Sequence, residues 1–80
     1  METVKSLRQK GYRVRVFHAR RYVEGNRPHE RGGSTEVQIF QDESFVTDGL
    51  ARCSDKENYD RKKGVRIALG RALDRLPFKL

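Results

Sequence analysis

The polar and hydrophobic residues of this chain alternate in three stretches and then change to a helical spacing near the C-terminus. The first stretch, residues 12–23, reads YRVRVFHARRYV. Val14 and Val16 fall on one face of it, and Arg13 and Arg15 fall on the other. This period of two is typical of a half-buried β-strand.

The phase of that first strand slips after Val16. Phe17 and Ala19 fall in the opposite phase, which predicts a β-bulge or a strong twist near His18. Arg20 and Arg21 flank the expected irregularity.

Two further strands are predicted at Ser34–Phe40 and Phe45–Cys53, separated by the turn QDES. Residues 24–34 are polar and hold three Gly and one Pro, so they predict a mobile hairpin loop between the first two strands. The Asp48-Gly49 pair predicts either a bulge or an early hairpin turn within the third strand.

An amphipathic helix is predicted before Pro77, which ends it because proline cannot donate a backbone hydrogen bond. The helix starts either at a capping box in Ser54–Glu57 or at Asp60. Its apolar arc consists of Val65, Ala68, Leu69, Ala72, Leu73 and Leu76. Ile67 is expected to point outward. Gly64 and Ala68 predict a flat flank that a phosphate backbone or a partner helix could approach.

These elements predict an α+β fold, a three-stranded antiparallel sheet in the order 1-2-3 with one face covered by a C-terminal helix (βββα). Residues 1–11 are interpreted as an arm or edge segment, and residues 12–80 as one small domain. A domain of 80 residues buries only about 60% of its unfolded surface, so its core is thin. A homodimer or another partner could extend that core.

Charge is the most informative feature of the composition. The net charge is +7, and it divides into +6 for residues 1–35, −5 for residues 36–60 and +6 for residues 61–80. Twelve of the eighteen cations are Arg, whose planar fork suits phosphate and carboxylate. Such a domain favours nucleic acid as its partner, with a merely solvated surface as the alternative.

The chain shows no catalytic or metal-binding motif. His18, His29 and Cys53 stand alone without zinc-ligand spacing. The acidic middle of the chain could bind a divalent ion, but no repeat spacing favours that over roles in turns and helix caps. We therefore expect a protein that is not an enzyme and needs no cofactor. One cysteine and the lack of a signal peptide or membrane-spanning run favour the cytoplasm.

Residues 49–73, GLARCSDKENYDRKKGVRIALGRAL, resemble the end of many small accessory proteins encoded by tailed phages. In those proteins a strand ending in ARC precedes an acidic turn, an aromatic residue, an Arg, a Gly and IALGRAL. The resemblance implies residence in a host cytoplasm and a role in host takeover or anti-defence.

The layout is also similar to the double-stranded RNA-binding domain, in which three antiparallel strands precede a helix that opens with lysines. The resemblance implies that Arg61, Lys62, Lys63 and Arg66 face phosphate. The sequence departs from that layout because no first helix is predicted before the first strand.

Two functions follow as hypotheses. The first is a non-enzymatic protein that binds nucleic acid, either DNA or RNA. The second is an inhibitor or adaptor that docks on an acidic surface of a host protein such as a nuclease or polymerase. The predicted binding residues are Arg13, Arg15, Arg20, Arg21, Lys62, Lys63, Arg66 and Arg71.

Overall fold

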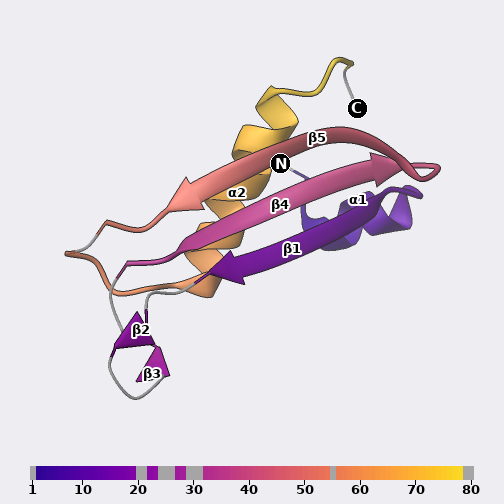
Figure 1. The fold of residues 1–80 in the computed structure, drawn as a ribbon. Helices are drawn as coiled ribbons and strands as arrows, with labels where there is room; N and C mark the ends of the chain where they lie inside the picture. The colour runs from indigo at the N-terminus through magenta and orange to yellow at the C-terminus, as the bar shows by residue number, and fades with distance from the viewer. Residues whose placement is uncertain (1, 20–21, 24–26, 29–31, 55, 79–80) are drawn as a thin grey trace.

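The computed structural model describes residues 2–19, 22–23, 27–28, 32–54 and 56–78 of the chain (Figure 1). The elements are α1 (Val4–Gln9), β1 (Arg13–Ala19), β2 (Tyr22–Val23), β3 (Arg27–Pro28), β4 (Ser34–Gln41), β5 (Ser44–Arg52) and α2 (Arg61–Asp74).

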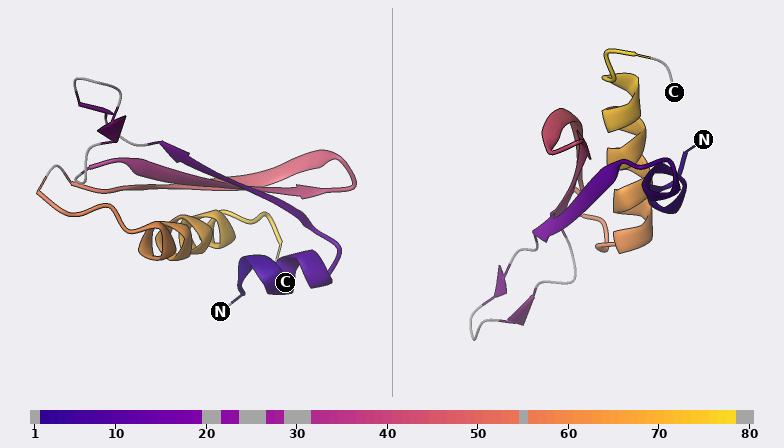
Figure 2. Two further views of the ribbon diagram at one scale, coloured as in Figure 1. Left: turned by 90° about the horizontal axis from the view of Figure 1, so that it is seen from below. Right: turned by 90° about the vertical axis from the view of Figure 1, so that its right-hand side faces the viewer.

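Three antiparallel strands form the main sheet in the order β1-β4-β5, which confirms the predicted α+β fold. Both helices lie on one face of this sheet and leave the other face open (Figure 2). The short β2 and β3 pair with each other and lie on the open side. β3 falls in the predicted loop, whereas β2 falls in the first predicted strand, which ends at Ala19 instead. Arg20 and Arg21 lie outside the described residues.

Of the two alternatives predicted near His18, a β-bulge or a strong twist, the bulge is wrong, because β1 pairs with β4 in unbroken register from Arg13 to Ala19. The strong twist stays a prediction. The hydrophobic phase changes because Phe17 is a hydrophobic residue on the open face of the sheet, where it is exposed. The register shifts between β4 and β5. Ile39 pairs with Thr47 and the next residue, Phe40, pairs with Phe45.

The β4–β5 hairpin turns at Asp42 and Glu43, within the predicted QDES turn. Both residues have positive φ angles of 49° and 70°, as a type I′ turn requires. Asp48 and Gly49 lie inside β5, so neither a bulge nor a turn forms at that pair.

The core lies between the sheet and the two helices. Its buried hydrophobic residues are Leu7, Val14, Val37, Ile39, Ala51, Ala68, Leu69 and Ala72. Thr47 is also buried, and its hydroxyl donates a hydrogen bond to the backbone oxygen of Ala72 at 2.9 Å. A polar group at this position is tolerated because its hydrogen bond is made within the core.

The N-terminal segment forms a helix instead of the arm described from the sequence. Thr3 caps α1, its side chain accepting from the Ser6 backbone N–H, while the Ser6 hydroxyl accepts in return from the Thr3 N–H. Leu7 is completely buried and ties α1 to the core. Six residues with two hydrophobic positions are too few for a helical period to be seen in the sequence.

Of the two predicted starts of α2, the structure has the one at Asp60. An Asp60 carboxylate oxygen accepts a hydrogen bond from the Lys63 N–H at 3.1 Å. A capping box at Ser54 is wrong, because the segment after β5 first makes a turn in which the Glu57 N–H donates to the Ser54 backbone oxygen.

Gly64 and Ala68 of α2 face the sheet, which corrects the interpretation of a flat flank open to a partner. A Cβ at Gly64 would lie 2.5 Å from the Thr35 hydroxyl oxygen, and Ala68 is completely buried. Ile67 is partly buried against the core, so the expectation that it points outward is also wrong. Small residues at these positions let α2 lie close to β4 and β5.

Candidate nucleic-acid interface

The sheet separates the predicted binding residues into two groups. Arg13 and Arg15 alternate with the buried Val14 and therefore point to the open face, away from the helices. Lys62, Lys63, Arg66 and Arg71 belong to α2, in the helix layer. The structure does not bring the two groups together, and the other two predicted residues, Arg20 and Arg21, are outside the described part of the chain.

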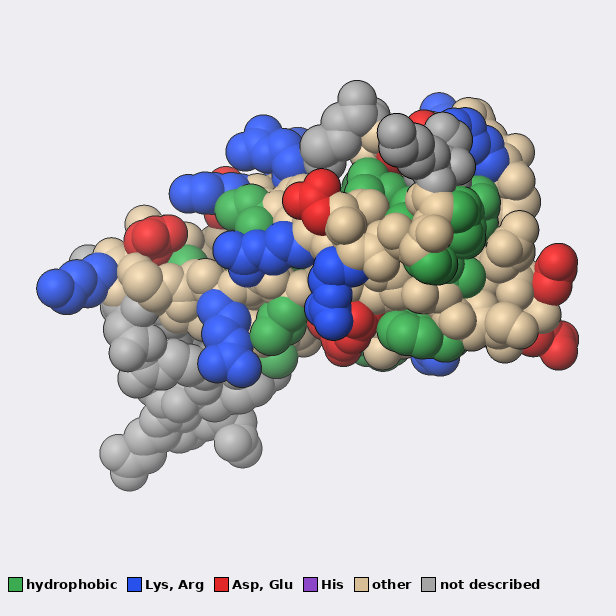
Figure 3. Space-filling model, turned by 90° about the horizontal axis from the view of Figure 1, so that it is seen from above, with side chains coloured by type: hydrophobic (Ala, Val, Ile, Leu, Met, Phe, Trp, Pro, Cys, Tyr) green, Lys and Arg blue, Asp and Glu red, His purple; other side chains and the backbone are tan. Residues whose placement is uncertain are grey.

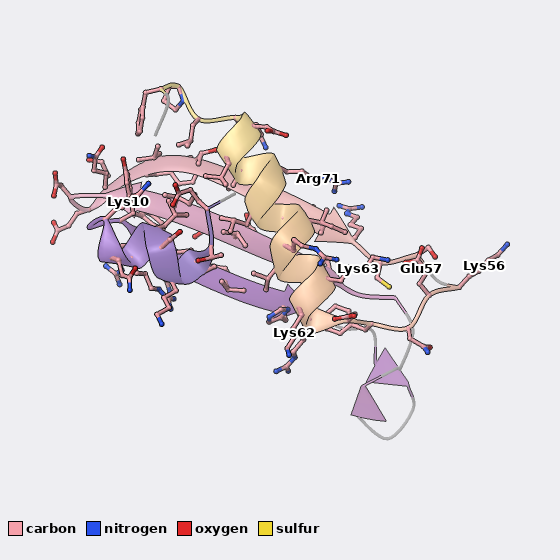
Figure 4. All side chains as sticks on the ribbon, turned by 180° about the vertical axis from the view of Figure 1, so that it is seen from behind. Lys10, Lys56, Glu57, Lys62, Lys63 and Arg71 are labelled. Atoms are coloured by element: carbon pink, nitrogen blue, oxygen red, sulfur yellow. The ribbon has the colours of Figure 1, made fainter. Side chains whose placement is uncertain are left out.

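On α2 itself, the cations on the β5 side have partners. The Lys63 ammonium lies 3.9 Å from the Glu57 carboxylate, and the Arg71 guanidinium donates to the Leu50 backbone oxygen at 2.6 Å. Figure 4 shows these two cations on the same side of the helix, and Lys62 toward the other side. Arg71 thus connects α2 to β5, and Lys63 pairs with the segment that precedes the helix.

The opposite side of α2 forms a groove with α1. Lys5, Arg61, Lys62 and Arg66 line this groove, and all four are exposed. Hydrophobic atoms of Val4, Val65 and Leu69 also line it. We refer to it as the inter-helix basic groove.

The four cations of the groove have no acidic partner within the described part of the chain. Glu2 also lines the groove, but its carboxylate pairs with Lys10 at 2.6 Å and accepts a hydrogen bond from the Ser6 hydroxyl at 2.7 Å. These hydrogen bonds, that of Lys10 first, lower the pKa of Glu2 below its ordinary value. Glu2 therefore does not neutralise the positive charge of the four cations in the groove.

The start of α2 adds to this positive potential. Its first three residues, Arg61, Lys62 and Lys63, are all basic, and its first turn holds no acidic residue. The N-terminus of a helix carries a partial positive charge, so three cations there are unfavourable for folding and favourable for an anion. Asp60, the N-cap, is the nearest carboxylate in sequence.

A cluster of polar side chains fixes the position of this helix start. The Tyr59 hydroxyl lies 2.5 Å from Nδ1 of His18 on β1 and donates to the Ser34 backbone oxygen on β4. Nδ1 of His18 is also 3.0 Å from the Thr35 hydroxyl. Burial, and then the charge of Arg61, lower the pKa of His18 below its ordinary value. The segment that leads into α2 is thus attached to two strands.

Two residues of the groove were missed in the set predicted for binding. Arg61 entered only through the resemblance to the double-stranded RNA-binding domain, and Lys5 was placed in the arm. The T-x-x-S spacing of Thr3 and Ser6 is the signal that could have revealed α1, because both hydroxyls cap its first turn.

Cys53 makes hydrogen bonds within the chain, and the described residues form no metal-binding cluster. The Cys53 thiol donates to the backbone oxygens of Glu57 and Asn58, at 3.3 and 3.4 Å. Within the described ranges, no group of three or more His, Cys, Asp and Glu side chains is placed to hold a metal ion. None of the described helices has the length and hydrophobicity needed to cross a membrane.

Comparison of the chain with known protein families, with curated proteins and with solved structures finds no match.

Proposed function

We propose that this chain is a non-enzymatic nucleic-acid-binding protein whose inter-helix basic groove holds a phosphate backbone. The observation that carries the proposal is the set of four exposed cations that line one groove without a carboxylate partner in the described chain: Lys5, Arg61, Lys62 and Arg66. Folding gains nothing from leaving such charges together and unpaired, whereas a polyanion gains a contact from each.

The order of the elements supports the same proposal. Helix α1 supplies the first helix that the predicted layout lacked. Apart from the short β2–β3 pair inserted after β1, the order becomes helix, three antiparallel strands, helix. This is the order of the double-stranded RNA-binding domain, to which the sequence shows a similarity of layout. A role as an accessory protein of a tailed phage remains a proposal that rests on the resemblance of residues 49–73.

The test is the binding of a labelled duplex, DNA or RNA, measured by fluorescence anisotropy as salt is raised. Four phosphate contacts predict a log–log slope of affinity against salt of about −3 to −4 on duplex DNA, because each contact releases counterions. The charge reversals Lys62→Glu and Arg66→Glu should each weaken duplex binding and make the slope shallower by about 1.

Lys63→Glu is the matched control for that experiment. It changes the net charge by the same amount in the same helical turn, but Lys63 lies on the other side of α2 beside Glu57. A smaller loss of affinity for Lys63→Glu than for Lys62→Glu is expected. Equal losses would show that only the net charge matters and would contradict the groove.

The hydrophobic residues of the groove favour a second candidate, the inhibitor or adaptor that docks on an acidic host protein. The groove has a hydrophobic surface formed by Val4, Val65 and Leu69. A hydrophobic side chain of a protein partner can pack on this surface, whereas a phosphate backbone makes no use of it. If the chain binds no DNA or RNA at about 50 mM salt, where charge attraction is strong, nucleic-acid binding fails. The second candidate then predicts that Lys62→Glu abolishes recovery of one acidic protein from lysate.

A further inference from the structure

The open face of the sheet carries large hydrophobic side chains in contact with water. Phe17, Phe45 and Leu50 are 42%, 57% and 38% exposed. Phe17 is the β1 neighbour of Glu36 on β4, and Leu50 is the β5 neighbour of the same residue. Single exposed hydrophobic residues are ordinary, but several on one sheet face mark an interaction surface.

The aromatic rings of this face occupy two places along the sheet. Phe40 and Phe45 are cross-strand partners whose rings meet edge to face, with centroids 5.8 Å apart. Phe17 lies opposite Glu36, four residues from Phe40 along β4. At about 3.4 Å per residue, four residues separate the two places by roughly 14 Å. A strand of a few nucleotides can span that distance.

Arginine side chains accompany the rings. Arg13 and Arg15 point to this face from β1, and the Arg15 guanidinium carbon lies 5.2 Å from the centroid of the Phe17 ring. Arg52, at the end of β5, is exposed and alternates with the buried Ala51. The carboxylate of Asp48 lies 3.5 Å from Arg75, which balances its charge. Figure 3 shows basic and hydrophobic side chains next to one another on the β5 side of the molecule, with acidic ones among them and at the end where the β4–β5 hairpin lies.

We propose that the open sheet face is a second nucleic-acid site, which takes a single strand by stacking its bases on Phe17, Phe40 and Phe45. Aromatic rings bind bases of any sequence through their π-faces, and the Arg residues of the same face hold the phosphates. This site lies on the side of the sheet opposite the inter-helix basic groove and does not depend on it.

The residues of the face favour a single strand over the other occupants. A duplex keeps its bases stacked inside, so it cannot place them on the rings. A second copy of this chain packed face to face would bury more cations than carboxylates, because the described residues of each face include Arg13, Arg15 and Arg52 against Glu36 and Asp48. Asp48 already pairs with Arg75, and excess like charge in a desolvated interface opposes association. A single strand uses both the rings and the Arg residues.

The test uses tryptophan as a reporter, because the chain contains none. In a Phe17→Trp variant, titration with an oligothymidylate of about 12 nucleotides at about 50 mM salt should quench the fluorescence. A duplex of the same length should leave the fluorescence unchanged, even while it binds elsewhere. Absence of quenching by the single strand would overturn the proposal.

Alanine variants separate stacking from hydrophobic contact. Phe17→Ala and Phe45→Ala should each lower the affinity for the oligothymidylate by roughly tenfold, the effect of losing one stacked base. Leu50→Ala is the matched control, because it removes a hydrophobic side chain of the same face without removing a ring. Affinity close to that of the parent is expected for it.

Two results contradict the proposal in different ways. If the phenylalanine variants bind the single strand like the parent, no stacking occurs. If the parent is a dimer by light scattering and Phe45→Ala or Leu50→Ala makes it a monomer, the face is an interface between copies. The proposed function is tested separately, since Lys62→Glu should weaken duplex binding and leave quenching of the Phe17→Trp reporter by the single strand in place.

Discussion

Gly49 is the residue on which the approach of α2 to the sheet depends most directly. A Cβ at this position would overlap the backbone oxygen of Ala68 and lie 2.5 Å from the backbone nitrogen of Ala72. Both are helix backbone atoms, which cannot move aside without moving α2. We expect Gly49→Ala to lower the free energy of unfolding by about 1–3 kcal/mol, the usual cost of overpacking, as measured by chemical denaturation.

Gly64→Ala is the comparison for this prediction. The atoms nearest to its added Cβ belong to the Thr35 side chain, and Ala is favoured over Gly within a helix by about 1 kcal/mol. This variant should therefore lose less stability than Gly49→Ala. The reverse order would mean that α2 does not lie against β5 as described.

His18 predicts how stability depends on pH. Burial and the charge of Arg61 lower its folded-state pKa below the ordinary value of 6.5, so the unfolded chain takes up this proton at a higher pH. The contribution of neutral His18 to the stability of the fold is fully present above pH 6.5, and it is lost as the pH falls through the folded-state pKa.

Thermal melts between neutral and mildly acidic pH measure this loss, and His18→Gln is the variant to compare. We expect the parent to lose more stability over that range than the variant. His29 is present in both chains, so the difference between them isolates His18. Parallel pH profiles for the two chains would show that His18 does not titrate differently on folding.

At the scale of elements, the short helix α1 contributes more than its length indicates. Leu7 is completely buried among the core residues, and the Arg8 guanidinium donates to the Val14 backbone oxygen of β1 at 2.9 Å. In a domain with few core residues, each large one has a large share of the stability.

Leu7→Ala should therefore cost about 2–5 kcal/mol, the usual cost of a Leu-to-Ala cavity, and denaturation of the variant measures it. Val4→Ala, in the same helix but only partly buried, should cost less. A change of less than about 1 kcal/mol for Leu7→Ala would mean that α1 is not packed on the core. The inter-helix basic groove would then lose one of its walls.

At the scale of the whole molecule, the sheet divides the basic residues into two surfaces. The inter-helix basic groove has cations and no exposed aromatic ring among its lining residues, whereas the open face combines Arg with Phe. The first basic block of the sequence is thus divided, because Lys5 lies at the groove with cations of the second block, whereas Arg13 and Arg15 lie on the open face. A chain of net charge +7 arranged in this way presents cations in two directions.

The local pattern of the sequence determined the three strands, their order and the amphipathic helix. The alternation in Arg13–Val16 predicts which side chains of the strand face the core, because a half-buried strand has a period of two. The apolar arc through Leu69 and Ala72 does the same for the helix, whose period is 3.6. The turn at Asp42 and Glu43 was also predictable, since polar residues separated two strands.

Only the tertiary structure decided which cations share a surface. Lys5 and Arg66 are far apart in sequence and lie at one groove because α1 and α2 cover the same face of the sheet. Arg13 and Lys62 belong to the two basic blocks, yet the sheet lies between them. A periodic pattern records how each segment meets the core, whereas the grouping of exposed charges depends on how the segments pack against one another, which no local pattern contains.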